Sequence, residues 1–321
     1  MTTNDMIEVE FPSFRYDLIM PMVQGRVPIE GVKLVPARGR RDAASWAKGE
    51  FGISDFNWST LLPAIEAGWE IVALPVFTKR KPVYQYWFCR ADAGISVPKD
   101  LEGKRIGARN YRTAIMIWGR GLLQDHYGVD LTKLQWETSI EDEFPIYDRG
   151  VKIEKAPDTN KGIIDRLLDG DVDAFITDVS DRGMFKILEN DPRVKRLFPR
   201  YWEDDLMLYR ETGIYTPVHM ALMSKKLDRE HPELAGKLFA GFEQAKEMAY
   251  DEILSDRAGF AVVYLRERMV EAMEQWGDPF KYGISANRST IDAYFRYNYE
   301  QGMCQSQHTY EEVFAKSTLD T

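Results

Sequence analysis

The chain has 321 residues, of which 44% are hydrophobic and 12% aromatic, enough to bury a sizeable core as two lobes or one large domain. Its formal net charge is −9 and it has no dense tract of Lys and Arg, so nucleic-acid binding is disfavoured. No apolar run approaches the ~20 residues that cross a bilayer, so no membrane partner is expected.

The two cysteines and the N-terminal residues indicate the cellular compartment of the protein. Cys89 and Cys304 lie far apart in the sequence, as is typical of free thiols in a reducing environment, and they have no metal-binding spacing. The opening MTTNDMIEVEFPSF has neither the basic nor the apolar region of a secretory signal. We therefore expect a cytoplasmic protein, and a homo-oligomer is compatible with this composition.

The first part of the chain alternates between strand and helix patterns. Strands are predicted at 6–10, 32–36, 51–54 and 71–76, and helices at 18–24, 43–48 and 61–67. Residues 55–60 are predicted to be the exit loop of the third strand. Strands and helices that alternate at this spacing favour a parallel α/β sheet.

The second part begins with an aromatic strand at 82–90. Further strands are predicted at 105–108, 134–138, 172–177 and 214–223. An apolar helical pattern runs from Ile115 to Leu123 and ends at Gly128, the predicted C-cap. Other helices are predicted at 163–168, from about Tyr201 to Thr212, and at 231–253, 258–276 and 289–302. Residues 141–161 are charged and irregular, which is typical of a surface excursion.

This order predicts a discontinuous two-lobe α/β protein. The first lobe is expected over residues 1–84 and 220–321, and the second over 91–214. The strands at 82–90 and 214–223 would be hinges, and the C-terminal helices would return to the first lobe. Two lobes joined by two crossings are typical of a protein that closes over a small ligand.

A candidate anion site lies where the strand at 105–108 leads into the next helix. The loop reads Arg109-Asn110-Tyr111-Arg112-Thr113. A helix start presents unpaired N–H groups and a positive dipole end, and arginine binds carboxylates through two parallel hydrogen bonds. Thr113 would add its hydroxyl or act only as a helix cap. From this stretch alone, an ordinary surface loop with solvated arginines is an equal alternative.

Other candidates follow strand ends, where open α/β sheets bind ligands. Arg15 and its neighbour Tyr16 lie in the first loop, and Lys79 and Arg80 are more simply solvated surface charges. Some polar residues can contact ring hydroxyls or orient a base, or else cap turns and helices: Ser54, Asp55, Asn57 and Asp178.

His219 is the candidate proton donor. It is the only histidine in an otherwise apolar predicted strand, and imidazole exchanges protons near neutral pH. A core histidine bonded to a backbone carbonyl is the alternative. The other three histidines, His126, His231 and His308, are interpreted as structural or solvated.

Nine phrases of this sequence are familiar in combination. They are GRVPIEGVKL (25–34), ALPVF (73–77), RADAGI (90–95), DLEGKRIG (100–107), WGRGLLQDHYGVD (118–130), RLFP (196–199), TGIYTPVH (212–219), HPELA (231–235) and YGISANRSTIDAYFRYNYEQG (282–302). With these phrases the chain resembles the 4,5-dihydroxyphthalate decarboxylase family over nearly its whole length. The resemblance implies the type II periplasmic-binding-protein fold put to catalytic use, and it favours a functional His219 in the hinge strand.

The chain departs from the family at three places. The first loop reads Arg15-Tyr16-Asp17 where Tyr-Asp-Arg is common, Asp55-Phe56-Asn57-Trp58 precedes Ser59 where small hydroxyl residues are usual, and Pro82-Val83-Tyr84-Gln85 replaces Arg-His-Ser. These places are expected at the cleft, so the substituents of the recognised ring stay open.

The resulting hypothesis is cofactor-independent decarboxylation of a hydroxylated aromatic acid between the lobes. The carboxylate would lie at Arg109–Thr113, with Arg112 and His219 as catalytic residues. No His-x-His, paired Cys or Glu-x-x-His predicts a metal site, and no cofactor fingerprint occurs. The alternative is a non-catalytic solute-binding protein or a sensor of a small carboxylate.

Overall fold

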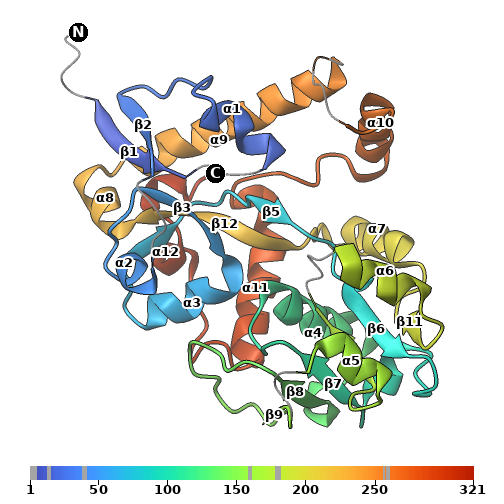
Figure 1. Cartoon of the computed structure of the whole chain (residues 1–321). Helices are drawn as coiled ribbons and strands as arrows, with labels where there is room; N and C mark the ends of the chain where they lie inside the picture. Colours follow the sequence, from blue (N-terminus) through green and yellow to red (C-terminus); the bar gives the residue numbers. More distant parts are fainter. Residues whose placement is uncertain are drawn as a thin grey trace. The chain divides into compact units, whose positions relative to one another are not determined.

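The structure, a computed structural model, describes residues 6–12, 16–37, 42–157, 161–177, 182–255, 257 and 261–321 (Figure 1). The chain forms two compact units. The first unit comprises residues 1–80, 217–291 and 308–321, and the second comprises residues 81–216 and 292–307. The expected first lobe contained all of 220–321, whereas residues 292–307 lie in the second unit. Periodicity alone could not show that Tyr294 and Tyr297 pack against Trp118.

The first unit contains two sheets. In the smaller, β1 (Ile7–Phe11) pairs in parallel with β2 (Val32–Pro36). In the larger, the central strand β12 (Pro217–Ser224) runs antiparallel to its three partners, which are β3 (Ile53–Asn57), β4 (Ile71–Ala73) and β5 (Lys79–Arg80). The predicted parallel pairing is therefore confirmed for β1 and β2 but is wrong for the larger sheet, where β12 is antiparallel to its partners, because hydrophobic periodicity does not encode strand direction.

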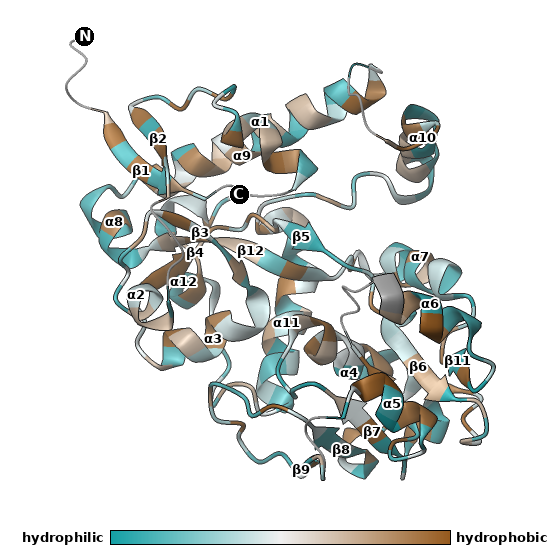
Figure 2. Ribbon diagram, viewed as in Figure 1, coloured by the Kyte–Doolittle hydropathy of each residue, from teal (hydrophilic) through white to brown (hydrophobic). Residues whose placement is uncertain are grey.

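Helices cover these sheets. Those of the first unit are η1 (Asp17–Ile19), α1 (Met20–Val23), α2 (Ala43–Ala47), α3 (Trp58–Glu66), α8 (Lys225–Glu230), α9 (Leu234–Leu254), α10 (Leu265–Trp276), η5 (Ser285–Asn287), α12 (Tyr310–Val313) and η6 (Lys316–Thr318). Apolar and polar residues alternate along α9 in Figure 2, as expected of a helix with one buried face. Leu234, Leu238 and Phe242 on that face pack in one core with Val9 and Ile53.

The second unit is built on a single six-stranded sheet. Its order is β11 (Val194–Arg196), β6 (Trp87–Arg90), β10 (Ala174–Ile176), β7 (Arg105–Ala108), β8 (Gln135–Thr138) and β9 (Lys152–Lys155). Strands β10, β7, β8 and β9 are parallel, and β6 is antiparallel to both of its neighbours. The parallel strands therefore end at one edge of the sheet.

The helices of this unit include α-helices and short 3-10 turns. They are η2 (Tyr84–Tyr86), η3 (Pro98–Leu101), α4 (Ala114–Tyr127), η4 (Leu131–Lys133), α5 (Ile163–Leu168), α6 (Arg182–Asn190), α7 (Tyr201–Thr212) and α11 (Arg288–Glu300), of which α11 begins in the first unit. Thr113 caps the start of α4, because its hydroxyl accepts the N–H of Met116 at 3.2 Å, and the predicted C-cap Gly128 follows the helix in the left-handed conformation.

Several predicted boundaries are wrong, three of them at short elements. Residues 55–57 belong to β3 rather than to an exit loop, the aromatic segment at 82–90 starts with η2 before β6, and the irregular segment at 141–161 contains β9. Each error concerns a short element, where turn and strand patterns overlap. Within the described ranges, no helix is both long enough and apolar enough to cross a bilayer.

Gly121 in α4 provides a test of the packing in the second unit. A Cβ at this position would collide with the ring of Tyr297. We expect Gly121→Ala to lower the free energy of unfolding by roughly 1–3 kcal/mol in urea titrations, despite the better helix propensity of alanine. His126→Ala, at an exposed position of the same helix, is the control and should change stability by at most about 0.5 kcal/mol. Equal stabilities of the two variants would contradict this packing.

Candidate functional site

The first unit brings three predicted residues together. Asp55 Oδ2 accepts a hydrogen bond from the Tyr16 hydroxyl at 2.9 Å and lies 2.8 Å from Nδ1 of His219. Tyr16 Oη is 3.3 Å from the same imidazole nitrogen. Thr78, which sequence reasoning missed, donates its hydroxyl to Asp55 Oδ1 at 2.5 Å. We call these four residues the Asp55 cluster.

Strand pairing explains this convergence. His219 on β12 lies opposite Asn57 of β3 in the antiparallel register. Asp55 precedes Asn57 by two residues and therefore faces the same side of the sheet, diagonal to His219. Tyr16 comes from the turn before η1, and Thr78 from the segment between β4 and β5. The placement of Asp55 within a strand is what aligns it with His219.

The hydrogen bonds assign roles to the groups of the Asp55 cluster. Burial raises the pKa of Tyr16 well above its ordinary value, and the charge of Asp55 and its hydrogen bond act in the same direction, so Tyr16 stays a donor. Because a carboxylate only accepts, Nδ1 of His219 carries a proton towards Asp55. The His219 side chain is 28% exposed, and its Nε2 has no hydrogen-bond partner within the described part of the chain. The imidazole can therefore exchange a proton with a ligand through Nε2.

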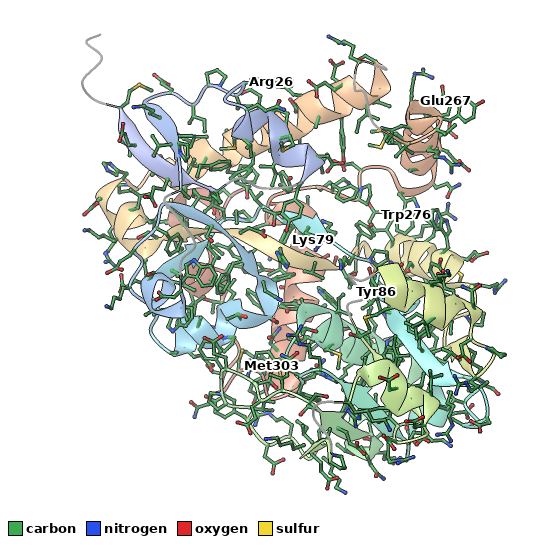
Figure 3. The ribbon with its side chains drawn as sticks, viewed as in Figure 1. Arg26, Lys79, Tyr86, Glu267, Trp276 and Met303 are labelled. Carbon is green, nitrogen blue, oxygen red and sulfur yellow. The ribbon has the colours of Figure 1, made fainter. Side chains whose placement is uncertain are left out.

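The remaining candidates of this unit have other roles. Asn57 caps α3, accepting the N–H and the hydroxyl of Ser59 at 3.1 and 2.8 Å, and the hydroxyl of Ser54 donates to the backbone oxygen of Asp55 at 3.4 Å. Lys79, labelled in Figure 3, lies on β5 in register with His219. Arg80 is 7% exposed and donates to Lys281 O at 2.8 Å and to Asn287 Oδ1 at 2.6 Å, so it is not a solvated charge. Arg15 lies outside the described residues.

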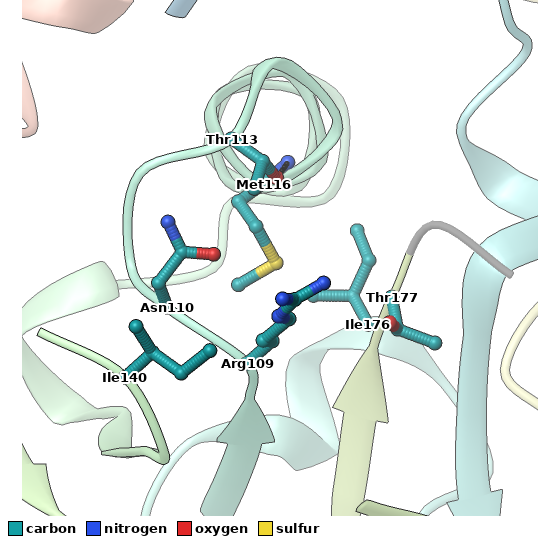
Figure 4. A pocket seen from close by; sticks show the side chains of 7 residues that line it. All are labelled: Arg109, Asn110, Thr113, Met116, Ile140, Ile176 and Thr177. Atoms are coloured by element: carbon teal, nitrogen blue, oxygen red, sulfur yellow. Dashed lines mark hydrogen bonds between the residues drawn. The ribbon is translucent and has the colours of Figure 1, made fainter. Parts of the chain in front are cut away.

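The predicted anion corner is a pocket of about 340 Å³ in the second unit. It is lined by Arg109, Asn110, Thr113, Met116, Ile140, Ile176 and Thr177, and we call it the Arg109 pocket. Figure 4 shows Arg109 extending from the end of β7 towards Ile176 and Thr177 at the end of β10, with Met116 reaching down from α4. The Arg109 side chain is exposed, and its guanidinium has no ion-pair or hydrogen-bond partner among the residues that the structure describes.

The chemistry of the Arg109 pocket suits a small carboxylate with an apolar body. The first-turn N–H groups of α4 that Thr113 does not cap favour an anion at this helix start, and Arg109 adds a full positive charge. Met116, Ile140 and Ile176 supply an apolar wall. Pockets of this volume commonly hold small molecules, roughly 300–1,000 Å³.

Asp142 holds the loop of this pocket, and sequence reasoning missed it. Its carboxylate accepts the backbone N–H groups of Tyr111 and Arg112 at 3.1 and 2.9 Å and the side-chain amide of Asn110 at 3.1 Å. Asn110 also donates to the Arg112 carbonyl at 2.8 Å. An acidic residue in a charged stretch has no distinctive sequence pattern, so only the fold identifies this anchor.

Two predicted loop residues are structural. Arg112 is 5% exposed, and its guanidinium donates to the carbonyls of Met303 at 2.9 Å and Pro145 at 2.7 Å, so the prediction that it contacts a substrate is not supported. Tyr111 is fully buried, with the guanidinium of Arg120 3.6 Å from its ring centre. Neither residue lines the Arg109 pocket. Asp178 lies outside the described residues.

No family model matches the sequence. Among curated proteins, the chain is similar to a 4,5-dihydroxyphthalate decarboxylase of Comamonas testosteroni, with 28% identity over 326 residues that cover 95% of this chain and 96% of that protein.

Solved structures share the fold at low sequence identity. The periplasmic sulfonate-binding protein SsuA of Methylobacillus flagellatus matches with a TM-score of 0.56 and 14% identity, over 97% of this chain and 92% of that chain. A mutant of the desulfurization enzyme DSZB, in complex with biphenyl-2-sulfinic acid, matches with a TM-score of 0.55 and 14% identity, over 98% of both chains. The predicted two-lobe periplasmic-binding-protein fold is thereby confirmed. Along almost its whole length, the chain is therefore similar in sequence to a protein named 4,5-dihydroxyphthalate decarboxylase, and it has the fold of the periplasmic binding proteins.

Proposed function

We propose that this protein removes carbon dioxide from a hydroxylated aromatic carboxylic acid without a cofactor, as in the conversion of 4,5-dihydroxyphthalate to protocatechuate. The observation that carries the proposal is the Asp55 cluster, which is an acid–base group in a chain similar to a decarboxylase over 95% of its length. A plain solute binder has no need of a histidine paired with a carboxylate and open to a ligand at Nε2.

The proposed chemistry is protonation of the ring. His219, doubly protonated, donates its Nε2 proton to the ring carbon that bears the leaving carboxylate. The electrons of the broken carbon–carbon bond return to the ring as carbon dioxide departs, and His219 is left neutral. Asp55 stabilises the imidazolium before the transfer, and Tyr16 and Thr78 hold the carboxylate of Asp55 in place. Hydroxyls on the ring supply the electron density that makes its carbon basic.

The Arg109 pocket supports the other half of the proposal, which is recognition of a carboxylate. A free guanidinium beside a helix start can bind a carboxylate in two parallel hydrogen bonds. Phthalate-type substrates carry two carboxylates, of which only one leaves. Arg109 would therefore bind the carboxylate that is retained.

A second candidate function is capture without turnover. It is favoured by the fold shared with SsuA and by the Arg109 pocket, which needs no catalyst to bind an acid. The desulfurization enzyme DSZB has the same fold, so the fold is compatible with either function.

The deciding experiment incubates the purified protein with 4,5-dihydroxyphthalate and follows carbon dioxide release and ring products by mass spectrometry. We expect one carbon dioxide and one protocatechuate per substrate consumed, with no added metal or cofactor. Phthalate, which lacks the ring hydroxyls, is the control and should stay intact because its ring is not activated. A ligand that raises the melting temperature but is recovered unchanged would instead support the solute-binding function.

A further inference from the structure

We propose that Glu66 and His308 form a binding site for a zinc-class divalent cation in the first unit, with Glu312 orienting the imidazole. Nε2 of His308 lies 3.5 Å from Glu66 Oε1, and Nδ1 lies 3.4 Å from Glu312 Oε2. The His308 side chain is only 6% exposed. Both ring nitrogens are buried, and neither has a hydrogen-bond partner within the described ranges.

A positive charge between Nε2 of His308 and the carboxylate of Glu66 would stabilise this arrangement. A neutral imidazole carries one N–H and one lone pair. If Nδ1–H faces Glu312, then the lone pair of Nε2 faces the carboxylate of Glu66, which is repulsive in a buried site. Either a proton or a metal ion on Nε2 removes the repulsion.

The distance favours the metal ion over the proton. A charge-assisted N–H···O bond would bring the two atoms to about 2.7–2.9 Å, whereas Nε2 and Oε1 are 3.5 Å apart. Zinc binds imidazole nitrogen and carboxylate oxygen at about 2.0–2.2 Å, so two tetrahedral ligands lie roughly 3.4 Å apart. The observed separation therefore fits two ligands of one ion.

Glu312 is suited to the orienting role. Its Oε2 accepts the N–H of Thr309 at 2.9 Å, and Thr309 in turn caps α12, so the carboxylate is fixed beside Nδ1. Histidines that bind metals commonly donate their second N–H to such a carboxylate.

The surroundings leave room for water and favour a cation. His308, Glu66 and Glu312 line a pocket of about 550 Å³ in the first unit. Four carboxylates but only two lysines line this pocket: Glu66, Asp228, Glu311, Glu312, Lys225 and Lys316. Water in the pocket would complete the coordination. Glu66 is the last residue of α3, and Asn57 at the end of β3 caps the first turn of the same helix. The helix therefore separates the proposed cation site from the end of β3, near Asp55, by about 13 Å.

Zinc binding by the full-length protein tests this proposal. After dialysis against a chelator, Zn²⁺ is titrated by calorimetry and by competition with a chromophoric chelator, and the melting temperature is measured with and without the ion. We expect one Zn²⁺ per chain and a higher melting temperature with zinc. Glu66→Gln and His308→Asn should each abolish this binding, and Glu312→Gln should weaken it about 10–100-fold.

Glu311→Gln is the matched control, since Glu311 lines the same pocket without facing His308. It should bind zinc as the wild type does. If His308→Asn does not fold, the zinc affinity of Glu66→Gln still tests the proposal. Equal zinc affinity in the wild type and Glu66→Gln, or no binding by the wild type, would overturn the proposal. Zinc binding is measured without substrate, so its failure is distinct from a failure of decarboxylation.

Discussion

Replacing His219 with glutamine is expected to lower kcat for decarboxylation by ~10²–10⁴-fold, the usual contribution of a general acid. Glutamine keeps a similar size and a hydrogen bond to Asp55 but cannot deliver a proton from the position of Nε2. Because proton transfer is felt only in the transition state, KM should change little. Initial rates of carbon dioxide release at several substrate concentrations measure both constants.

Two further variants show whether such a loss is specific. His231→Gln changes the C-cap residue that follows α8 in the same unit, and it should keep the wild-type kcat. Asp55→Asn should lower kcat as well, because the imidazolium loses its negative partner while the shape of the Asp55 cluster is retained. If His219→Gln turns over within twofold of the wild type, His219 is not the proton donor and the Asp55 cluster serves another purpose.

Three members of the Asp55 cluster were separate candidates from the sequence, but their contacts with one another could not be predicted. An isolated histidine in an apolar strand pattern, together with the family resemblance, indicated His219, and the position after the strand predicted at 51–54 indicated Asp55. Their hydrogen bond depends on the register of β12 against β3, which places Asp55 two residues from the partner of His219. Thr78 comes from a segment distant in sequence, so no local pattern could assign its hydroxyl to Asp55.

The two arginines of the loop after β7 show a second limit of sequence reasoning. Arg109 and Arg112 have the same chemistry and lie three residues apart, so a pattern treats them alike. The fold separates them, since Arg112 binds the carbonyls of Met303 and Pro145 while Arg109 lines the pocket. Because a buried guanidinium is costly without hydrogen-bond acceptors, that of Arg112 binds the nearby carbonyls. Which arginine stays available to a ligand is therefore a property of tertiary packing.

This separation leads to opposite expectations for the two arginines. Arg109→Ala should raise KM for the acid by roughly 10–100-fold, since a hydrogen bond to a charged group contributes about 1.5–3 kcal/mol. Arg109→Lys should recover part of this loss, because it keeps the charge but not the planar fork. Arg109 is exposed, so the effect should shrink as ionic strength rises. Substrate titrations at low and high salt measure these changes.

Arg112→Lys and Arg193→Ala complete the test. Lysine cannot span the two carbonyls that Arg112 binds, so Arg112→Lys should lower the melting temperature, and any folded fraction should keep a near-normal KM. Arg193 is an exposed arginine of the same unit paired with Asp191, and its removal should leave both constants unchanged. If KM rises in Arg112→Lys but not in Arg109→Ala, then Arg109 does not bind the carboxylate of the substrate. The carboxylate would then have to be bound elsewhere than in the Arg109 pocket.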